Sequence, residues 1–156
     1  MKLEYKILNK PKYRWTGEWI HGRRKYILIN SVDIVINGVL YVIPAGFVWD
    51  GWSIPLIIYN FFDLTYDLIP ALIHDYFYEM AGIYPEISRN IADTLLRNIA
   101  IDRGCIKREV YIAYYVVKLV SGHIWRKYKR HNLGIKELPE DQYSHITFNP
   151  HKKGKA

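Results

Sequence analysis

Residues 32–44, VDIVINGVLYVIP, contain the clearest structural pattern in the chain. Two runs rich in branched apolar residues flank Asn37-Gly38. This dipeptide favours a tight hairpin, because both turn positions need a positive φ. The sequence therefore predicts antiparallel strands over 32–36 and 39–43. Further strand patterns over 3–8, 12–16 and 25–30 place the hairpin in an N-terminal antiparallel sheet.

A helical pattern follows the strands. Pro70 favours a helix start and Gly82 a helix stop, and two more helices are expected over 85–102 and 107–129. The short break at 82–84 makes the first two helices antiparallel neighbours. The sequence thus predicts an α+β fold: an N-terminal antiparallel β-sheet, a three-helix unit and an irregular basic C-terminal tail. We expect a single domain over 1–131 and the tail over 132–156.

Charge is unevenly distributed along the 156 residues, whose net charge is +7. Residues 1–30 carry eight Lys/Arg and two acids, and residues 122–156 carry eight and three. These basic ends fit a solvated surface, nucleic acid, anionic lipid or an acidic partner. Fourteen tyrosines and five tryptophans predict many rings at surfaces or interfaces.

Membrane and secretion signals are not expected. The opening residues, MKLEYKILNK, lack the apolar stretch of a signal peptide. The apolar runs stop short of the roughly 18 residues that a transmembrane helix needs. Cys105 is the single cysteine, so no disulfide can form within the chain, and we expect a small buried side chain there.

Residues 71–80, ALIHDYFYEM, place His74, Asp75 and Tyr78 in an otherwise apolar helix. His74 and Tyr78 are four residues apart and share a face. Asp75 points about 100° away from His74, so we expect the pair to border one pocket rather than to hydrogen-bond side by side. Asp93, on the next helix, is the natural partner for His74, and Tyr78 lies within reach of it.

Two interpretations of this cluster are open. In the catalytic one, His74 takes a proton from water, Asp75 holds a divalent cation such as Ca²⁺, and Asp93 orients the imidazole. In the structural one, His74 is a half-buried core histidine. Asp93 is then a surface ion pair with Arg89 and Arg97, which lie four residues to either side of it.

The segment PAGFVWDGWSIP, residues 44–55, is too apolar for a free linker. Asp50 and Ser53 are its small polar side chains, and the structural interpretation gives both a turn-capping role. The functional interpretation makes Asp50 a second metal ligand beside Asp75.

Several segments together resemble a family of small, mostly uncharacterised bacteriophage and prophage proteins. These segments are GFVWDGWSIP, ALIHDYFY, RNIAD and VSGHIW, and the family pattern is G-F-x-x-D-x-x-S-I-P, H-D-x-x-Y and a later A-D pair. The resemblance implies a phage or prophage origin and a location in the virion or the host cytoplasm. Its implied partners are other phage proteins or a second copy of the chain.

A more distant similarity is to phospholipases A2, which use H-D-x-x-Y on one helix and an aspartate on the antiparallel helix. His74, Asp75, Tyr78 and Asp93 occur in that order, but the glycine-rich calcium loop is missing. This similarity implies an ester hydrolase acting on lipid of the host envelope.

Three functions are therefore expected. The first is a virion or tail-associated component with a buried His/Asp polar site. The second is a metal-assisted His-Asp ester hydrolase. The third is a nucleic-acid or host-factor binder that acts through the basic ends.

Overall fold

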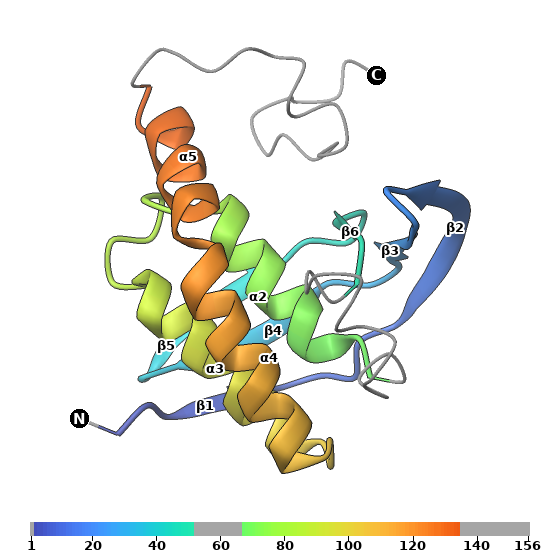
Figure 1. The fold of residues 1–156 in the computed structure, drawn as a ribbon, viewed down its shortest axis with the longest axis horizontal. Helices are drawn as coiled ribbons and strands as arrows, with labels where there is room; N and C mark the ends of the chain where they lie inside the picture. Colours follow the sequence, from blue (N-terminus) through green and yellow to red (C-terminus); the bar gives the residue numbers. More distant parts are fainter. Residues whose placement is uncertain (1, 52–66, 135–156) are drawn as a thin grey trace. The chain divides into compact units, whose positions relative to one another are not determined.

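The computed structural model describes residues 2–51 and 67–134 and confirms the α+β class, with strands first and helices afterwards (Figure 1). The chain divides into two compact units. The strand unit spans Glu4–Asp50, and the helical unit begins at Gly51. The expected single domain over 1–131 stays a prediction, and the expected tail lies almost entirely outside the described residues.

The predicted hairpin forms two of the three strands of the first sheet of the strand unit, with β4 at its centre. β4 (Val32–Ile36) pairs antiparallel with β5 (Val39–Ile43) and with β1 (Tyr5–Ile7). Asn37 and Gly38 both have positive φ, as the turn requires. Alternate residues of β4 are buried, which gives the sheet one apolar face.

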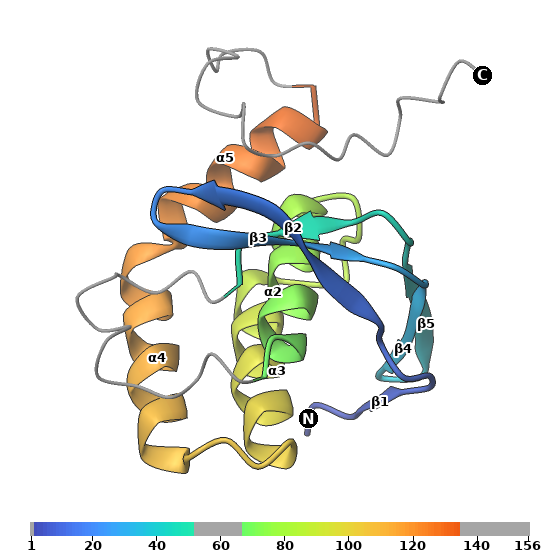
Figure 2. The same cartoon turned by 90° about the vertical axis from the view of Figure 1, so that its right-hand side faces the viewer.

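The second sheet of the strand unit has the order β2–β3–β6 and is also antiparallel. β2 (Tyr13–Ile20) and β3 (Arg23–Leu28) form the long hairpin seen in Figure 2. The pairing shifts register between Trp15 and Trp19. The sequence did not predict the short strand β6 (Val48–Trp49), which lies in the apolar segment before the helices.

The described part of the helical unit contains four helices, where the sequence predicted three. They are α2 (Ile69–Glu79), α3 (Arg89–Asp102), α4 (Lys107–Val120) and α5 (Gly122–Asn132). The prediction of one helix over 107–129 is wrong, because the chain turns at Ser121 and a new helix starts at Gly122. Ser and Gly pairs are a recognised cause of such breaks.

The connection between α2 and α3 is longer than expected. It runs from Met80 to Ser88, and α3 starts at Arg89 rather than near Pro85. Ser88 is the N-cap, and its hydroxyl accepts a hydrogen bond from the Ile91 amide at 3.3 Å. The buried residues of α3 include Ala92, Asp93 and Leu96, and the helix packs against α2.

Polar side chains fix both ends of α2. Asp67 accepts a hydrogen bond from the Ile69 amide at 3.1 Å and pairs with Arg103 at 2.6 Å. At the other end, the Asn132 side chain donates to the carbonyls of Glu79 and Ala81. These contacts tie α2 to the ends of α3 and α5.

Cys105 is buried, as predicted. Across residues 2–51 and 67–134, no helix has the length and apolar character needed to cross a bilayer.

Candidate functional site

α2 brings three of the predicted site residues to one region of the helical unit. His74 and Tyr78 are both buried, with ring centroids 4.2 Å apart. Asp75 is partly exposed, with 18% of its side chain accessible. Apart from Glu79 at its C-terminal end, the rest of the helix is mostly apolar, so these side chains are the polar part of a core element.

His74 and Asp75 do contact each other, contrary to the expectation from helix geometry. Nδ1 of His74 lies 3.3 Å from Oδ1 of Asp75. The angle of about 100° between consecutive residues describes only the directions in which the two side chains leave the helix. Adjacent Cα atoms are only about 3.8 Å apart, and both side chains are long enough to curve together over the helix surface.

The carboxylate of Asp93, on α3, is completely buried, with an exposed fraction of 0%. Its Oδ1 atom accepts a hydrogen bond from the Tyr78 hydroxyl at 2.7 Å and lies 3.1 Å from Nε2 of His74. The structure therefore brings His74, Asp75, Tyr78 and Asp93 together.

Asp93 is not the surface residue that the structural interpretation assumed. Nε of Arg89 does lie 3.8 Å from Oδ2 of Asp93, as the spacing suggested. Arg97, the other expected partner, instead has its guanidinium 4.8 Å from the ring centre of Tyr114. One of the two predicted ion pairs is present, and its acid is in the core.

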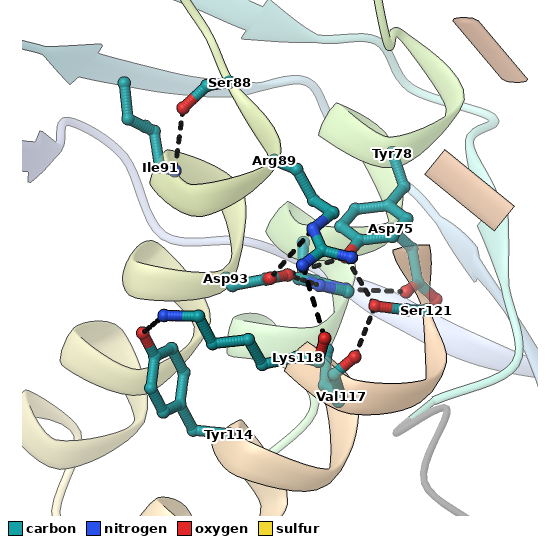
Figure 3. Close-up of polar contacts among 11 residues, drawn as sticks. Asp75, Tyr78, Ser88, Arg89, Ile91, Asp93, Tyr114, Val117, Lys118 and Ser121 are labelled. Carbon is teal, nitrogen blue, oxygen red and sulfur yellow. Dashed lines mark hydrogen bonds and ion pairs between the residues drawn. The ribbon is translucent and has the colours of Figure 1, made fainter. Parts of the chain in front are cut away.

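The sequence did not identify Ser121, which extends the cluster to the junction of α4 and α5 (Figure 3). Its hydroxyl oxygen lies 2.7 Å from the Tyr78 hydroxyl oxygen and also bonds to the Val117 carbonyl. Tyr78 uses its own proton for Asp93, so the single Ser121 proton is available either to the Tyr78 oxygen or to the Val117 carbonyl. The Ser-Gly pair within a helical pattern was the signal that would have located this junction.

Gly122 is another residue that the sequence did not single out, and it lies against Arg89, one of the two ion-pair partners expected for Asp93. Nη2 of Arg89 donates to the Lys118 carbonyl at 3.3 Å (Figure 3). A Cβ atom at Gly122 would collide with Nη1 of Arg89. The absence of a side chain at Gly122 therefore leaves room for the guanidinium that faces Asp93. We call the full set the His74 network: His74, Asp75, Tyr78, Arg89, Asp93 and Ser121.

The electrostatics of the network favour a charged imidazole. Burial alone would lower the pKa of His74, but hydrogen bonds and charge attraction from Asp75 and Asp93 outweigh it and raise that pKa. An ionised carboxylate only accepts hydrogen bonds, so both ring nitrogens must donate. Burial, followed by the negative charge of Asp93, raises the pKa of Tyr78, which keeps its hydroxyl protonated.

The two remaining predicted site residues are Asp50 and Ser53. Asp50 belongs to the strand unit, where its carboxylate lies 3.5 Å from Arg23. Ser53 lies outside the described residues. Within 2–51 and 67–134, no group of three or more His, Cys, Asp or Glu side chains is arranged to hold a metal ion. The metal-binding roles of Asp75 and Asp50 stay predictions.

Comparison with known proteins gives one match. The model of a family described as "Protein of unknown function (DUF1353)" matches residues 31–117. The matched range includes β4, β5, α2 and α3, and it therefore covers every member of the His74 network except Ser121. No curated protein and no solved structure showed a significant match.

Proposed function

The chain belongs to the DUF1353 family, and we propose that it is a non-enzymatic bacteriophage-type protein, a component of the virion or its tail. In this proposal the His74 network locks the helical unit into one arrangement. The observation that carries it is the environment of His74. Both ring nitrogens face carboxylate oxygens, at 3.1 and 3.3 Å, and the side chain is buried.

This environment disfavours general-base catalysis by His74. A general base must be unprotonated and within hydrogen-bonding distance of the proton that it removes. The raised pKa favours the charged imidazole, and a charged imidazole has no lone pair to accept a proton. Only 5% of the residue is accessible, so an attacking water has little access to it.

The same contacts suit a structural role. Asp93 on α3 receives hydrogen bonds from two residues of α2, and Tyr78 continues the chain to Ser121 between α4 and α5. Hydrogen bonds within a buried polar network rigidify a core and specify one arrangement of its elements. Among the described residues, Oδ2 of Asp93 has no hydrogen-bond partner and faces Nε of Arg89 at 3.8 Å. The bacteriophage assignment is supported by the motif set at 46–55, 74–78 and 92–93.

The structural role is tested by comparing His74→Gln with His123→Gln, a matched change at an exposed histidine of α5. We expect His74→Gln to lower the free energy of unfolding by about 1–3 kcal/mol, the cost of leaving buried partners unsatisfied. The control should change it by less than about 0.5 kcal/mol. Equal effects in urea titrations would contradict the proposal.

The virion assignment needs a separate measurement. Mass spectrometry of purified particles, from the phage or prophage that encodes the chain, should detect the protein at a fixed ratio to known structural proteins. Its absence from the particles, with the protein present in the lysate, would refute the assignment.

A hydrolase remains a second candidate, because one oxygen of Asp93 is shared by Tyr78 and Nε2 of His74. Phospholipases A2 likewise use H-D-x-x-Y on one helix and an aspartate on the antiparallel helix, and His74, Asp75, Tyr78 and Asp93 resemble that pattern. Asp75 is partly exposed, and a divalent cation such as Ca²⁺ held there would draw its carboxylate away from Nδ1 of His74. Ester hydrolysis of phospholipid vesicles should then require Ca²⁺ and vanish in His74→Gln. Such activity would overturn the non-enzymatic proposal.

A further inference from the structure

The solvent face of α4 is apolar, and so is the start of α5. Six large side chains are exposed there: Tyr111, Ile112, Tyr115, Leu119, Val120 and Ile124. Leu119 is 85% accessible and Tyr115 is 58% accessible. We call these six residues the α4–α5 face.

The spacing of these residues makes the face continuous along α4. Tyr111, Tyr115 and Leu119 follow one another at intervals of four, with Ile112 beside them, so they form a single stripe. The opposite side of the helix, from Val110 to Val117, is already buried within the protein. A surface helix normally has one apolar stripe, directed at the core, and α4 has a second one directed at solvent.

The two helices that carry these apolar residues are rich in positive charge. Residues 107–132 contain seven Lys/Arg and a single acid, Glu109, which is buried. The seven bases are Lys107, Arg108 and Lys118 on α4 and Arg126, Lys127, Lys129 and Arg130 on α5. A binding partner that complements the α4–α5 face therefore needs negative charge on its surface and an apolar layer below that surface.

We infer that the α4–α5 face binds the surface of an anionic lipid bilayer. Aliphatic side chains such as Leu119 and Ile112 would enter the boundary between headgroups and acyl chains, where an amphipathic helix lies parallel to the membrane. The hydroxyls of Tyr111 and Tyr115 would stay at headgroup level, which is the usual position of tyrosine in membranes. The Lys and Arg side chains of the two helices would contact the anionic headgroups.

Other partners fit this surface less well. A second copy of the chain, related by a two-fold axis, would bring the same cluster of bases opposite itself. Duplex DNA would satisfy the bases, but it would cover the aliphatic centre of the face with phosphates. A bilayer complements both the charge and the apolar centre.

Co-sedimentation of the full-length protein with vesicles tests this inference. One set contains phosphatidylcholine alone, and the other contains phosphatidylcholine and phosphatidylglycerol in a ratio of about two to one. We expect binding to the anionic vesicles only, and weaker binding at higher salt. Leu119→Asp should reduce binding about tenfold or more. Leu40→Asp, the same change at an exposed leucine of β5, should not change it.

A double charge reversal, Arg126→Glu with Arg130→Glu, should also reduce binding about tenfold or more. If the circular dichroism spectrum shows that Leu119→Asp alters the fold, Tyr115→Ser provides a second variant that removes a large side chain from the α4–α5 face. Equal binding to both vesicle types would overturn the inference, as would unchanged binding by Leu119→Asp and Tyr115→Ser. Two other results would also overturn it, each in a protein that does not bind vesicles. The first is binding to duplex DNA, and the second is a dimer that dissociates in the Leu119→Asp variant. The inference does not depend on the His74 network, so either proposal can fail alone.

Discussion

The buried carboxylate of Asp93 is the member of the His74 network whose loss should cost the most stability. Asp93→Asn keeps the shape of the side chain and removes its charge. His74 would then lose one of its two carboxylate partners, and Arg89 would lose its anion. Removing one partner of a buried ion pair costs about 3–5 kcal/mol. Two features favour the lower end, about 3 kcal/mol: the amide introduced by the substitution would keep an acceptor oxygen, and Arg89 has 31% of its side chain accessible to solvent.

The assay is urea denaturation followed by circular dichroism, at pH 6 and at pH 9. His74 has a raised pKa, so its contribution to stability is complete below the unfolded value of 6.5 and is lost as pH rises through the folded value. The cost of Asp93→Asn should therefore be larger at pH 6 than at pH 9. At pH 6 the expected loss corresponds to a fall in Tm of about 6–12 °C.

Asp102→Asn is the matched control, because it makes the same chemical change at an exposed position of α3. It should cost less than about 0.5 kcal/mol. A double-mutant cycle with His74→Gln should give a coupling energy of about 1 kcal/mol or more. If the two Asp→Asn variants lose equal stability, or if the loss for Asp93→Asn is the same at both pH values, Asp93 does not hold a charged His74.

Three further changes test contacts around the network. Burial and the nearby Asp75 charge raise the pKa of Glu79 to about 9, so the stability of the wild-type protein should fall as pH rises from 4.5 to 9. In Glu79→Gln, stability measured by calorimetry should depend less on pH, and the variant should be more stable than the wild type at pH 8 by about 1 kcal/mol. Gly122→Ala should displace the Arg89 guanidinium and cost about 1 kcal/mol in thermal unfolding, and an unchanged Arg89 position in a crystal structure of the variant would contradict this. Asn132→Ala removes the donor to two carbonyls at the end of α2 and should lower the free energy of unfolding by about 1 kcal/mol. Amide hydrogen exchange in the last turn of α5 should become faster, and unchanged exchange there would contradict a role for Asn132 in joining α5 to α2.

The sequence was most informative where local chemistry decides the structure. Asn37-Gly38 predicted the hairpin with both strand boundaries correct, because only a few residue types adopt two successive positive φ values. The predicted end of the second helix, at residue 102, also agrees with the structure, in which α3 ends at Asp102. The start of α3 was placed too early because Pro85 also suits a helix start, whereas the observed N-cap is Ser88.

The helix break at Ser121 was missed for a different reason. Apolar residues continue at helical spacing from Val110 to Trp125, so periodicity alone predicts one long helix. The break also decides where Ser121 lies, and without it no sequence pattern connects Ser121 to Tyr78. Long-range contacts of this kind come from tertiary packing, which local patterns do not contain.

Apart from Ser121, the members of the candidate site were predictable, but the chemistry of the site was not. Helix spacing and the distance to Asp93 in the sequence identified His74, Tyr78 and Asp93 as neighbours. The protonation of His74 depends on two contacts together, and the one to Asp75 was excluded by an argument that ignored side-chain flexibility. This contact occupies Nδ1, the second ring nitrogen of His74, with Asp75. With Nε2 facing Asp93, neither nitrogen is left to accept a proton from water.

The balance of charge around α2 explains why these groups have the protonation states described. Two carboxylates, Asp75 and Asp93, meet two cations, His74 and Arg89. Loss of the His74 proton would leave two anions with a single cation, in a site where one carboxylate is fully buried. Glu79 is a third carboxyl group on the same helix, and its raised pKa keeps it neutral beside Asp75. A hydrolase would have to remove the His74 proton before each turnover, and a cation bound at Asp75 would supply the compensating charge. The structural role requires no such compensation, because the network is already neutral as it stands.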